Sequence, residues 1–317
     1  MLVSILIPCY NAERWIAQAV ESALAQTWAD KEVIVVDDGS TDGSADIVRG
    51  FGDAVVFEAA PHLGGNHARN RLLSRARGQW LQYLDADDYL LPDKIGNQVG
   101  FLASHQDADV VYGPVAVEYA DGRAEGLEVL RIPEPRDLWV LLALWYLPQT
   151  GAPLWRKQAI VDVGGWDERQ RVCQEHDLYL RLLIAGKRFA YCEANGAVWR
   201  VWGASSVSTG NRPEVRKRRL EIEQAAEEFL CARGRLTTAR HAAINQARFG
   251  MARVAWREDD REGAHQALAA LRRSAPGFQP TSEPLLYRLM WKCVGFSVTE
   301  TMAGWRRTLV SRPGEAR

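Results

Sequence analysis

The feature that most constrains the fold of this chain is a pair of acidic clusters, each placed directly after an apolar run of strand length. Asp37 and Asp38 follow the run Val33–Val36, and the stretch Asp-Ala-Asp-Asp at 85–88 follows Trp80–Leu84. Continuous apolar runs of this length are typical of strands that are buried on both faces of a sheet. A capped turn that opens the next helix would explain the first cluster alone. Because the pattern occurs at two strand ends, it favours a shared functional edge.

The segments around these clusters alternate between the periods of strands and helices. Apolar runs predict strands at Leu2–Pro8, Val33–Val36, Val55–Glu58 and Trp80–Leu84. Amphipathic patterns between them predict helices at Ala12–Gln26, Ser44–Phe51 and Asn66–Arg77. This alternation predicts an α/β fold with a mostly parallel sheet and helices on both faces. In such sheets ligands bind at the carboxyl ends of the strands, where both acidic clusters lie.

The pattern changes after Pro92. We expect a helix at Asp93–Ser104, a hairpin across Val110–Leu130 with its turn at Asp121-Gly122, and helices at Arg136–Leu147 and from Gln174 to Gly186. From Arg212 onward only helices are predicted, with breaks near Gly234 and Asp259-Asp260. The sequence therefore predicts an α/β region at 1–210, with halves at about 1–92 and 93–210, followed by a helical region at 211–317.

Composition excludes several classes of protein. The 317 residues carry 39 Lys and Arg against 40 Asp and Glu, and this balance argues against a nucleic-acid-binding protein. The five cysteines are scattered without CxxC pairs, so we expect reduced and mostly buried thiols. The start of the chain lacks a basic leader, and its longest apolar run, Leu138–Leu147, is too short to span a bilayer. We therefore expect a cytoplasmic protein.

Five carboxylates at one sheet edge would repel one another unless a cation or a donor-rich ligand lies among them. Carboxylate oxygens suit Mg²⁺ or Mn²⁺, and these ions commonly bridge protein carboxylates to phosphate oxygens. The clusters therefore predict a divalent cation and a phosphate-bearing ligand.

Six motifs then occur in one order from residue 3 to residue 182. They are Val3–Asn11 (VSILIPCYN), Val33–Thr41 (VIVVDDGST), Ala68–Asn70 (ARN), Leu84–Asp88 (LDADD), Val163–Glu168 (VGGWDE) and Gln174–Leu182 (QEHDLYLRL). Together they resemble the family 2 inverting glycosyltransferases, which have the GT-A fold. The resemblance implies transfer of a sugar from a UDP-, GDP- or dTDP-type donor to a hydroxyl of a saccharide or lipid-linked glycan, in the synthesis of cell-surface polysaccharides or glycoconjugates.

The resemblance also implies how the nucleotide is bound. Pro8 and Tyr10 would line the base, Asp38 would accept hydrogen bonds from the base or ribose, and Arg69 would face the same nucleotide. Asp85 would contact the ribose.

The metal would be held by Asp87, with Asp88 alongside, and would be Mn²⁺ or Mg²⁺. A cation here would offset the charge of the diphosphate in an acidic pocket, which agrees with the interpretation of the carboxylates above.

The catalytic base falls in the family to the Asp of a Glu-Asp pair at the start of a helix. Here that pair is replaced by Gln174-Glu175, so Glu175 occupies the position of the base, and Asp177 lies two residues further on. Residues i and i+2 do not share a helix face, so we expect one of the two to act. We favour Glu175. A first-turn acid that only stabilises the helix N-terminus is the alternative for either residue.

A second departure from the family concerns the stretch Trp199–Ser208. Relatives often carry a His that approaches the diphosphate, and here Trp202 takes its place. Arg200 remains as a source of positive charge for a bidentate contact with the diphosphate.

The stretch Pro284–Arg312 combines apolar residues with five basic ones, Arg288, Lys292, Arg306, Arg307 and Arg312. This pattern is typical of a peripheral contact with the anionic inner face of a membrane, and equally of a helix packed on the catalytic region or in a homodimer.

Two other functions remain open at this stage. A sugar-phosphate nucleotidyltransferase shares the fold class, but it usually has a Gly-rich loop after the first strand, where this chain has Pro8-Cys9-Tyr10-Asn11. A non-catalytic scaffold that binds a nucleotide or glycan is consistent with the departures at Gln174 and Trp202.

Overall fold

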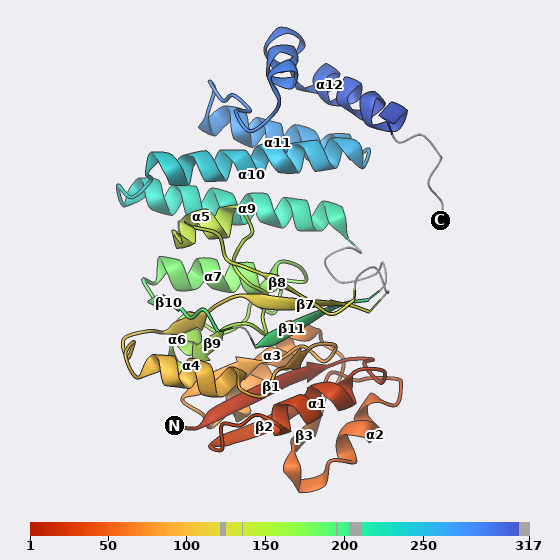
Figure 1. The fold of residues 1–317 in the computed structure, drawn as a ribbon, viewed down its shortest axis with the longest axis vertical. Coiled ribbons are helices and arrows are strands. Elements are labelled where there is room, and N and C mark those ends of the chain that lie inside the picture. Colours follow the sequence, from red (N-terminus) through yellow and green to blue (C-terminus); the bar gives the residue numbers. More distant parts are fainter. Residues whose placement is uncertain (121–124, 135, 195, 203–210, 311–317) are drawn as a thin grey trace. The chain divides into compact units, whose positions relative to one another are not determined.

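The computed structural model describes residues 1–120, 125–134, 136–194, 196–202 and 211–310 (Figure 1). The chain divides into two compact units, an α/β unit at Met1–Gly210 and a helical unit at Asn211–Arg317. Each unit has its own hydrophobic core, and each is described by itself below.

The larger sheet of the α/β unit has seven strands in the order β10-β6-β9-β4-β1-β2-β3. Their bounds are β1 Val3–Cys9, β2 Lys31–Asp37, β3 Val56–Ala59, β4 Trp80–Tyr83, β6 Val110–Tyr112, β9 Leu154–Arg156 and β10 Phe189–Tyr191. The β1–β2, β1–β4, β2–β3 and β6–β10 pairs are parallel, and only β9 runs antiparallel to its neighbours. The predicted mostly parallel sheet is therefore confirmed.

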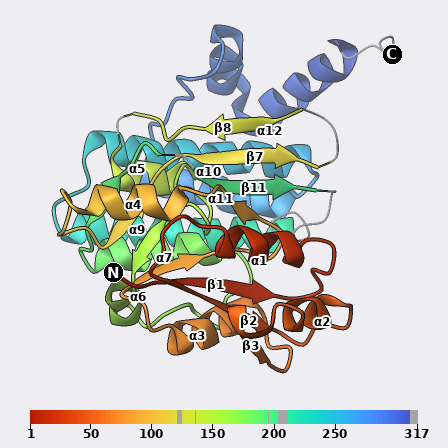
Figure 2. The ribbon, with the colours of Figure 1, turned by 60° about the horizontal axis from the view of Figure 1, so that its bottom comes forward.

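A smaller sheet has the order β5-β11-β7-β8, and Figure 2 shows β11, β7 and β8 side by side. Its strands are β5 Tyr89–Leu90, β7 Val115–Tyr119, β8 Leu127–Leu130 and β11 Ala197–Val201. The predicted hairpin is right for β7 and β8, which pair antiparallel, and wrong for β6, which joins the larger sheet. The predicted turn at Asp121-Gly122 lies outside the described residues.

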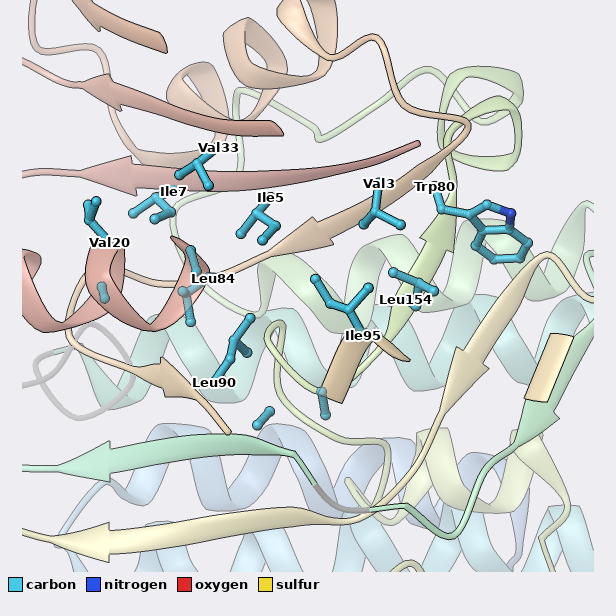
Figure 3. Packing of buried hydrophobic residues seen from close by; sticks show 14 of the residues in the cluster. Val3, Ile5, Ile7, Val20, Val33, Trp80, Leu84, Leu90, Ile95 and Leu154 are labelled. Carbon is cyan, nitrogen blue, oxygen red and sulfur yellow. The ribbon is translucent and has the colours of Figure 1, made fainter. Parts of the chain in front are cut away.

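The helices of the α/β unit cover the larger sheet on both faces. Their bounds are α1 Ile16–Leu24, α2 Ser44–Arg49, the 3₁₀ turn η1 Gly52–Ala54, α3 Gly65–Arg75, α4 Lys94–Leu102, α5 Leu138–Ala143, α6 Lys157–Asp162 and α7 Gln174–Ile184. Side chains alternate along a strand, so Val3, Ile5 and Ile7 share one face, where they pack with Val20 of α1 and Ile95 of α4 (Figure 3). In Figure 2, α1 and α3 lie on opposite sides of β1.

The first helix begins four residues later than predicted. Asn11 has a left-handed backbone with φ of 47°. Its Oδ1 accepts a hydrogen bond from the Thr41 backbone N–H at 2.8 Å, and its own N–H donates to Ser40 Oγ at 2.9 Å. These contacts hold the chain after β1 as a loop against the end of β2, so the helix starts only at Ile16.

The helical unit contains α9 Arg212–Ala232, α10 Thr238–Arg257, α11 Arg261–Ser274 and α12 Leu285–Val310. The breaks lie where they were predicted, because Gly234 and Asp259 adopt left-handed backbones. Side chains of Asn211, Thr237 and Asp260 accept hydrogen bonds from backbone N–H groups of the first turns that follow. No helix in the described part of the chain is long and apolar enough to serve as a membrane span.

A charged cluster is buried between α9 and α10. Glu223 is 1% exposed and lies 3.8 Å from Arg248 Nε, while Arg248 Nη2 donates to Glu227 Oε2 at 2.7 Å. Among the described residues, neither carboxylate oxygen of Glu223 has a hydrogen-bond partner. Burial raises the pKa of Glu223 to about 8, because desolvation outweighs the nearby Arg219 and Arg248.

The cysteines depart from the prediction. All five thiols are free, but only Cys9 and Cys192 are buried, whereas Cys231 and Cys293 are exposed. The expectation of mostly buried thiols is therefore wrong, since both exposed cysteines lie on outward faces of α9 and α12.

Candidate active site

A cleft of about 890 Å³ opens at the carboxyl ends of β1, β2 and β4. One wall is formed by residues 8–12, Trp15 and Asp38, and another by the loop 62–64 and the start of α3. Asp85 to Asp87 lie between these walls, and residues 168–171, Gln174 and Trp202 complete the rim. The prediction that the ligand site lies at this edge of the sheet therefore agrees with the shape of the molecule.

Asp38 organises the first wall. Its carboxylate accepts hydrogen bonds from the backbone N–H groups of Leu63 and Gly64, both at 2.9 Å, and lies 2.9 Å from His62 Nδ1. Gly39 next to it has φ of +74°, and a Cβ there would lie 2.8 Å from the backbone nitrogen of His62. The Asp-Gly pair thus brings the loop 62–64 close to the end of β2.

Tyr10 lies against this loop. Its ring stacks on His62 with the ring centroids 4.1 Å apart, and the side chain is 46% exposed. Pro8 and Tyr10 both border the cleft, as the resemblance implied. An exposed aromatic face beside a cleft offers a surface on which a flat heterocycle can stack.

Arg69 lies at the centre of the cleft and is 8% exposed. Its Nη2 donates to Asp85 Oδ1 at 2.8 Å, its Nη1 donates to Gln174 Oε1 at 2.6 Å, and its guanidinium lies 4.9 Å from the Trp166 ring centroid. Arg69 therefore connects the acidic motif after β4 with the first residue of α7.

The ARN motif ties α3 to the segment before α7. The side-chain amide of Asn66 donates to the Asp167 carbonyl at 2.7 Å, and that of Asn70 donates to the Trp166 carbonyl at 2.8 Å. Three polar residues on one helix, Asn66, Arg69 and Asn70, thus hold residues 166–174 along the cleft.

Asp87 faces the cleft beside Asp85. Its Oδ2 accepts a hydrogen bond from Trp202 Nε1 at 2.9 Å. Burial and the negative charge of Asp85 raise the pKa of Asp87 above its ordinary value. This carboxylate is thus in the environment that a bound cation would stabilise.

The carboxylates of Asp85 and Asp87 suit a cation that is shared with a bound ligand rather than one that protein groups enclose. The contacts described above engage one oxygen of Asp85 and one of Asp87, so each carboxylate has a second oxygen for another ligand. Mg²⁺ commonly binds one or two carboxylates together with substrate phosphates and waters. Among the described residues, no group of three or more His, Cys, Asp or Glu side chains could hold a metal by itself.

The five predicted carboxylates do not all gather in the cleft, because only Asp38, Asp85 and Asp87 line it. Asp37 is buried at the end of β2, and its Oδ2 accepts a hydrogen bond from the Ser40 backbone N–H at 3.1 Å. It is not among the residues that line the cleft.

Asp88, predicted as a metal ligand, also lies outside the cleft. It is 4% exposed; its Oδ1 accepts from the Arg200 backbone N–H at 2.9 Å and its Oδ2 from Gln149 Nε2 at 3.3 Å. Burial and the charge of Asp87 raise its pKa well above the ordinary value. Asp88 thus connects the chain after β4 to β11, and its position does not agree with the predicted role as a metal ligand.

Arg200, predicted to contact the diphosphate, also needs correction. Its guanidinium donates to Glu118 Oε2 at 2.8 Å, to the Asp87 carbonyl at 2.8 Å and to Gln18 Oε1 at 2.7 Å. It lies over the ring of Trp15 at 4.4 Å and does not line the cleft. All three nitrogens already donate to these protein groups. Arg200 therefore holds the Asp87 backbone in place and does not serve as a diphosphate contact.

The two base candidates differ in position. Asp177 is buried, accepts a hydrogen bond from Arg181 Nε at 2.8 Å and does not border the cleft. Its carboxylate forms an ion pair with Arg181 within α7, so Asp177 is the less favoured of the two candidate catalytic residues.

Glu175 is not among the lining residues either, but it directly follows Gln174, which is. Its side chain is 28% exposed and lies 3.6 Å from His176 Nδ1. Burial raises the pKa of the Glu175 carboxyl, but the interactions with His176 and the charge of Arg69 outweigh this effect and lower the pKa from its ordinary value.

Sequence reasoning missed His62 and Gln174 as cleft residues. His62 lies in a loop without periodicity, and only the Asp38 contacts bring it to Tyr10. Gln174 enters the sequence analysis only as a departure from the family pattern, and its contact with Arg69 joins residues that are 105 positions apart in the sequence.

Comparison with known proteins agrees with this geometry. Residues 4–157 match the model of glycosyl transferase family 2. Succinoglycan biosynthesis protein ExoU of Rhizobium meliloti is 32% identical over 263 residues, which cover 77% of this chain and 73% of that protein. The chain belongs to glycosyl transferase family 2.

Other family 2 relatives match less of their length. An uncharacterized glycosyltransferase of Rickettsia typhi is 29% identical over 188 residues, which cover 57% of this chain and 58% of that protein. Among solved structures, S. aureus TarS 1-349 in complex with UDP-GlcNAc has a TM-score of 0.57 at 16% identity, covering 86% of this chain and 92% of that one. This likeness confirms the predicted GT-A fold.

Proposed function

We propose that this chain is an inverting glycosyltransferase that moves one sugar from a nucleoside diphosphate sugar to a hydroxyl of a saccharide or lipid-linked glycan. The observation that carries the proposal is the open cleft that Arg69, Asp85 and Asp87 line together with the exposed ring of Tyr10. An aromatic surface and charged groups in one cleft match a nucleotide and its diphosphate. We assign this activity to residues 1–210.

In this proposal the nucleotide lies along the first wall. Tyr10 and Pro8 contact the base, while Asp38 holds the loop 62–64 in place and presents its remaining lone pairs to the base or ribose. The TarS structure is a complex with UDP-GlcNAc, and this supports a nucleotide sugar as the class of donor here.

Asp87, with Asp85 beside it, would hold a divalent cation, Mn²⁺ or Mg²⁺, together with the diphosphate. When bound, such a cation neutralises the charge that develops on the departing nucleoside diphosphate. Trp202 Nε1 and the Arg200 guanidinium orient Asp87, through its carboxylate and its carbonyl respectively. Arg69 holds Asp85 from the opposite side.

Glu175 would remove the proton from the acceptor hydroxyl as that oxygen attacks the anomeric carbon. The lowered pKa of its carboxyl supports this role, since a base must be in the ionised form to accept a proton. One base outside the acidic motif suffices for a single displacement, and such a displacement inverts the anomeric centre.

A thermal-shift screen of UDP-, GDP- and dTDP-sugars, with and without Mn²⁺, tests the proposal. We expect one nucleotide to raise the unfolding temperature, and the rise to need the metal. Arg69→Met should abolish this shift, whereas Arg71→Met on the exposed side of the same helix should retain it. Failure of every nucleotide to shift the wild-type chain would refute the proposed function.

A further inference from the structure

Helix α12 carries an exposed apolar surface beside basic residues. Leu285, Leu286 and Leu289 are 67%, 58% and 52% exposed, which is unusual for three leucines within five residues. Arg288 and Lys292 are exposed on the same helix. At 100° per residue, Arg288, Lys292, Leu285, Leu289 and Leu286 follow one another around a single arc of the helix.

The opposite side of the same helix is packed into the helical unit. Tyr287 is buried and Trp291 is partly buried, and both contact the core cluster around Phe249. The alternative of a packed helix, which the sequence left open beside a membrane contact, therefore applies to one side of α12 only. The leucine side is left on the surface.

The exposed side continues past a bend. Gly295 interrupts α12 with φ of 75°, and Figure 1 shows two helical pieces that meet at an angle. On the second piece Val298 and Met302 are 46% and 47% exposed, and their i, i+4 spacing places them on one face.

The charges of α12 are divided between the two sides. Its one acidic residue, Glu300, is buried and accepts hydrogen bonds from Tyr287 at 2.7 Å and from Arg253. Arg288 and Lys292 are therefore not offset by an acid of α12. Exposed leucines with a net positive charge beside them suit a surface that is apolar at shallow depth and negatively charged at its boundary.

We propose that the leucine face of α12 (Leu285, Leu286, Leu289, Arg288 and Lys292) docks the chain on the surface of an anionic lipid bilayer. The leucines enter the boundary between headgroups and acyl chains, and the two basic residues contact lipid phosphates. The helix lies in the plane of the surface, because the side that carries Tyr287 stays packed on α10 and α11.

Co-sedimentation of the purified full chain with vesicles tests this inference. One set of vesicles contains phosphatidylcholine alone and the other adds phosphatidylglycerol. We expect binding to the anionic vesicles and little to the neutral ones. Leu286→Glu with Leu289→Glu should abolish binding, and Arg288→Gln with Lys292→Gln should weaken it about thirtyfold, since each of the two basic residues contributes on the order of 1 kcal/mol at an anionic surface.

Val254→Glu is the matched control, because Val254 is a 45% exposed apolar residue on α10 and does not belong to the leucine face of α12. It should bind vesicles as the wild type does, and circular dichroism should show unchanged helix content in all variants. Wild-type binding that fails, or that persists in the double-leucine variant, overturns the inference. So does a wild-type dimer by light scattering that becomes monomeric in that variant without vesicle binding, since a second copy would then cover the face. The assay contains no sugar donor, so its outcome is independent of the proposed function.

Discussion

The acids that border the cleft of the α/β unit and the buried Glu223 of the helical unit differ in their hydrogen bonding. In the α/β unit, Asp85 and Asp87 border an open cleft, and each is held by a hydrogen-bond donor on one oxygen. In the helical unit, Glu223 is buried without a hydrogen-bond partner among the described residues. A carboxylate that keeps a free oxygen at a cleft can serve a ligand, whereas one enclosed without donors mainly makes stability depend on pH.

The largest effect should come from removing the charge of Asp87. We expect Asp87→Asn to lower sugar transfer by more than about a thousandfold, because several kcal/mol of charge stabilisation by a bound cation would be lost. Titration with Mn²⁺, followed by its electron paramagnetic resonance signal, should show weaker metal binding in parallel. Asp46→Asn, at an exposed acid of α2, is the control and should behave as the wild type does. Full turnover of the Asp87 variant in excess chelator would contradict the prediction that Asp87 acts by holding a cation.

The next effect concerns Glu175. Glu175→Gln should lower kcat roughly a hundredfold to a thousandfold while donor binding, measured by calorimetry, stays unchanged. Because the pKa of Glu175 is lowered from its ordinary value, the rate of the wild type should begin to fall at a more acidic pH than it would with an unperturbed glutamate as the base.

Asp177→Asn sharpens the assignment. This variant breaks the ion pair with Arg181, so it should lower the unfolding temperature with little change in kcat of the folded enzyme. The reverse result, in which Asp177→Asn loses transfer and Glu175→Gln does not, would move the base to Asp177.

The smallest effect concerns Glu223 and stability alone. Its folded pKa of about 8 lies above the ordinary value of 4.5, so the folded state binds the extra proton and stability falls as pH rises between these values. We expect the free energy of unfolding to drop by up to about 4 kcal/mol from pH 5 to pH 9, measured by urea denaturation.

Glu223→Gln should flatten this dependence, whereas Glu228→Gln at an exposed position of the same helix should not. An equal pH dependence in Glu223→Gln and the wild type would show that Glu223 is paired in solution, and the contrast between the units would then disappear.

Much of the α/β unit could be predicted because strand and helix periods are local properties of the sequence. The runs at β1, β2 and β4 and the helix after Gln174 are all present. The prediction failed where distant contacts override the local pattern. Asn11 bonds to Ser40 and Thr41 shorten α1, and β6 pairs with β9 and β10 rather than with its neighbour in sequence.

The candidate site divides in the same way. The motif positions Tyr10, Asp38, Arg69, Asp85 and Asp87 all border the cleft. Residue type alone does not reveal that the Asp88 carboxylate accepts a hydrogen bond from the Arg200 backbone, or that the Arg200 guanidinium donates to the Asp87 carbonyl. Both contacts depend on the pairing of β11 with β5.

The contacts of α3 set a lower limit on the piece of chain that can form the candidate site. The family match ends at residue 157, but Asn66, Arg69 and Asn70 find their partners between residues 166 and 174. A fragment cut at residue 157 would expose the polar side of α3 to water and would let Arg69 turn fully onto Asp85. Any truncated enzyme prepared for crystallisation or engineering must therefore extend through α7, well past the boundary that sequence matching draws.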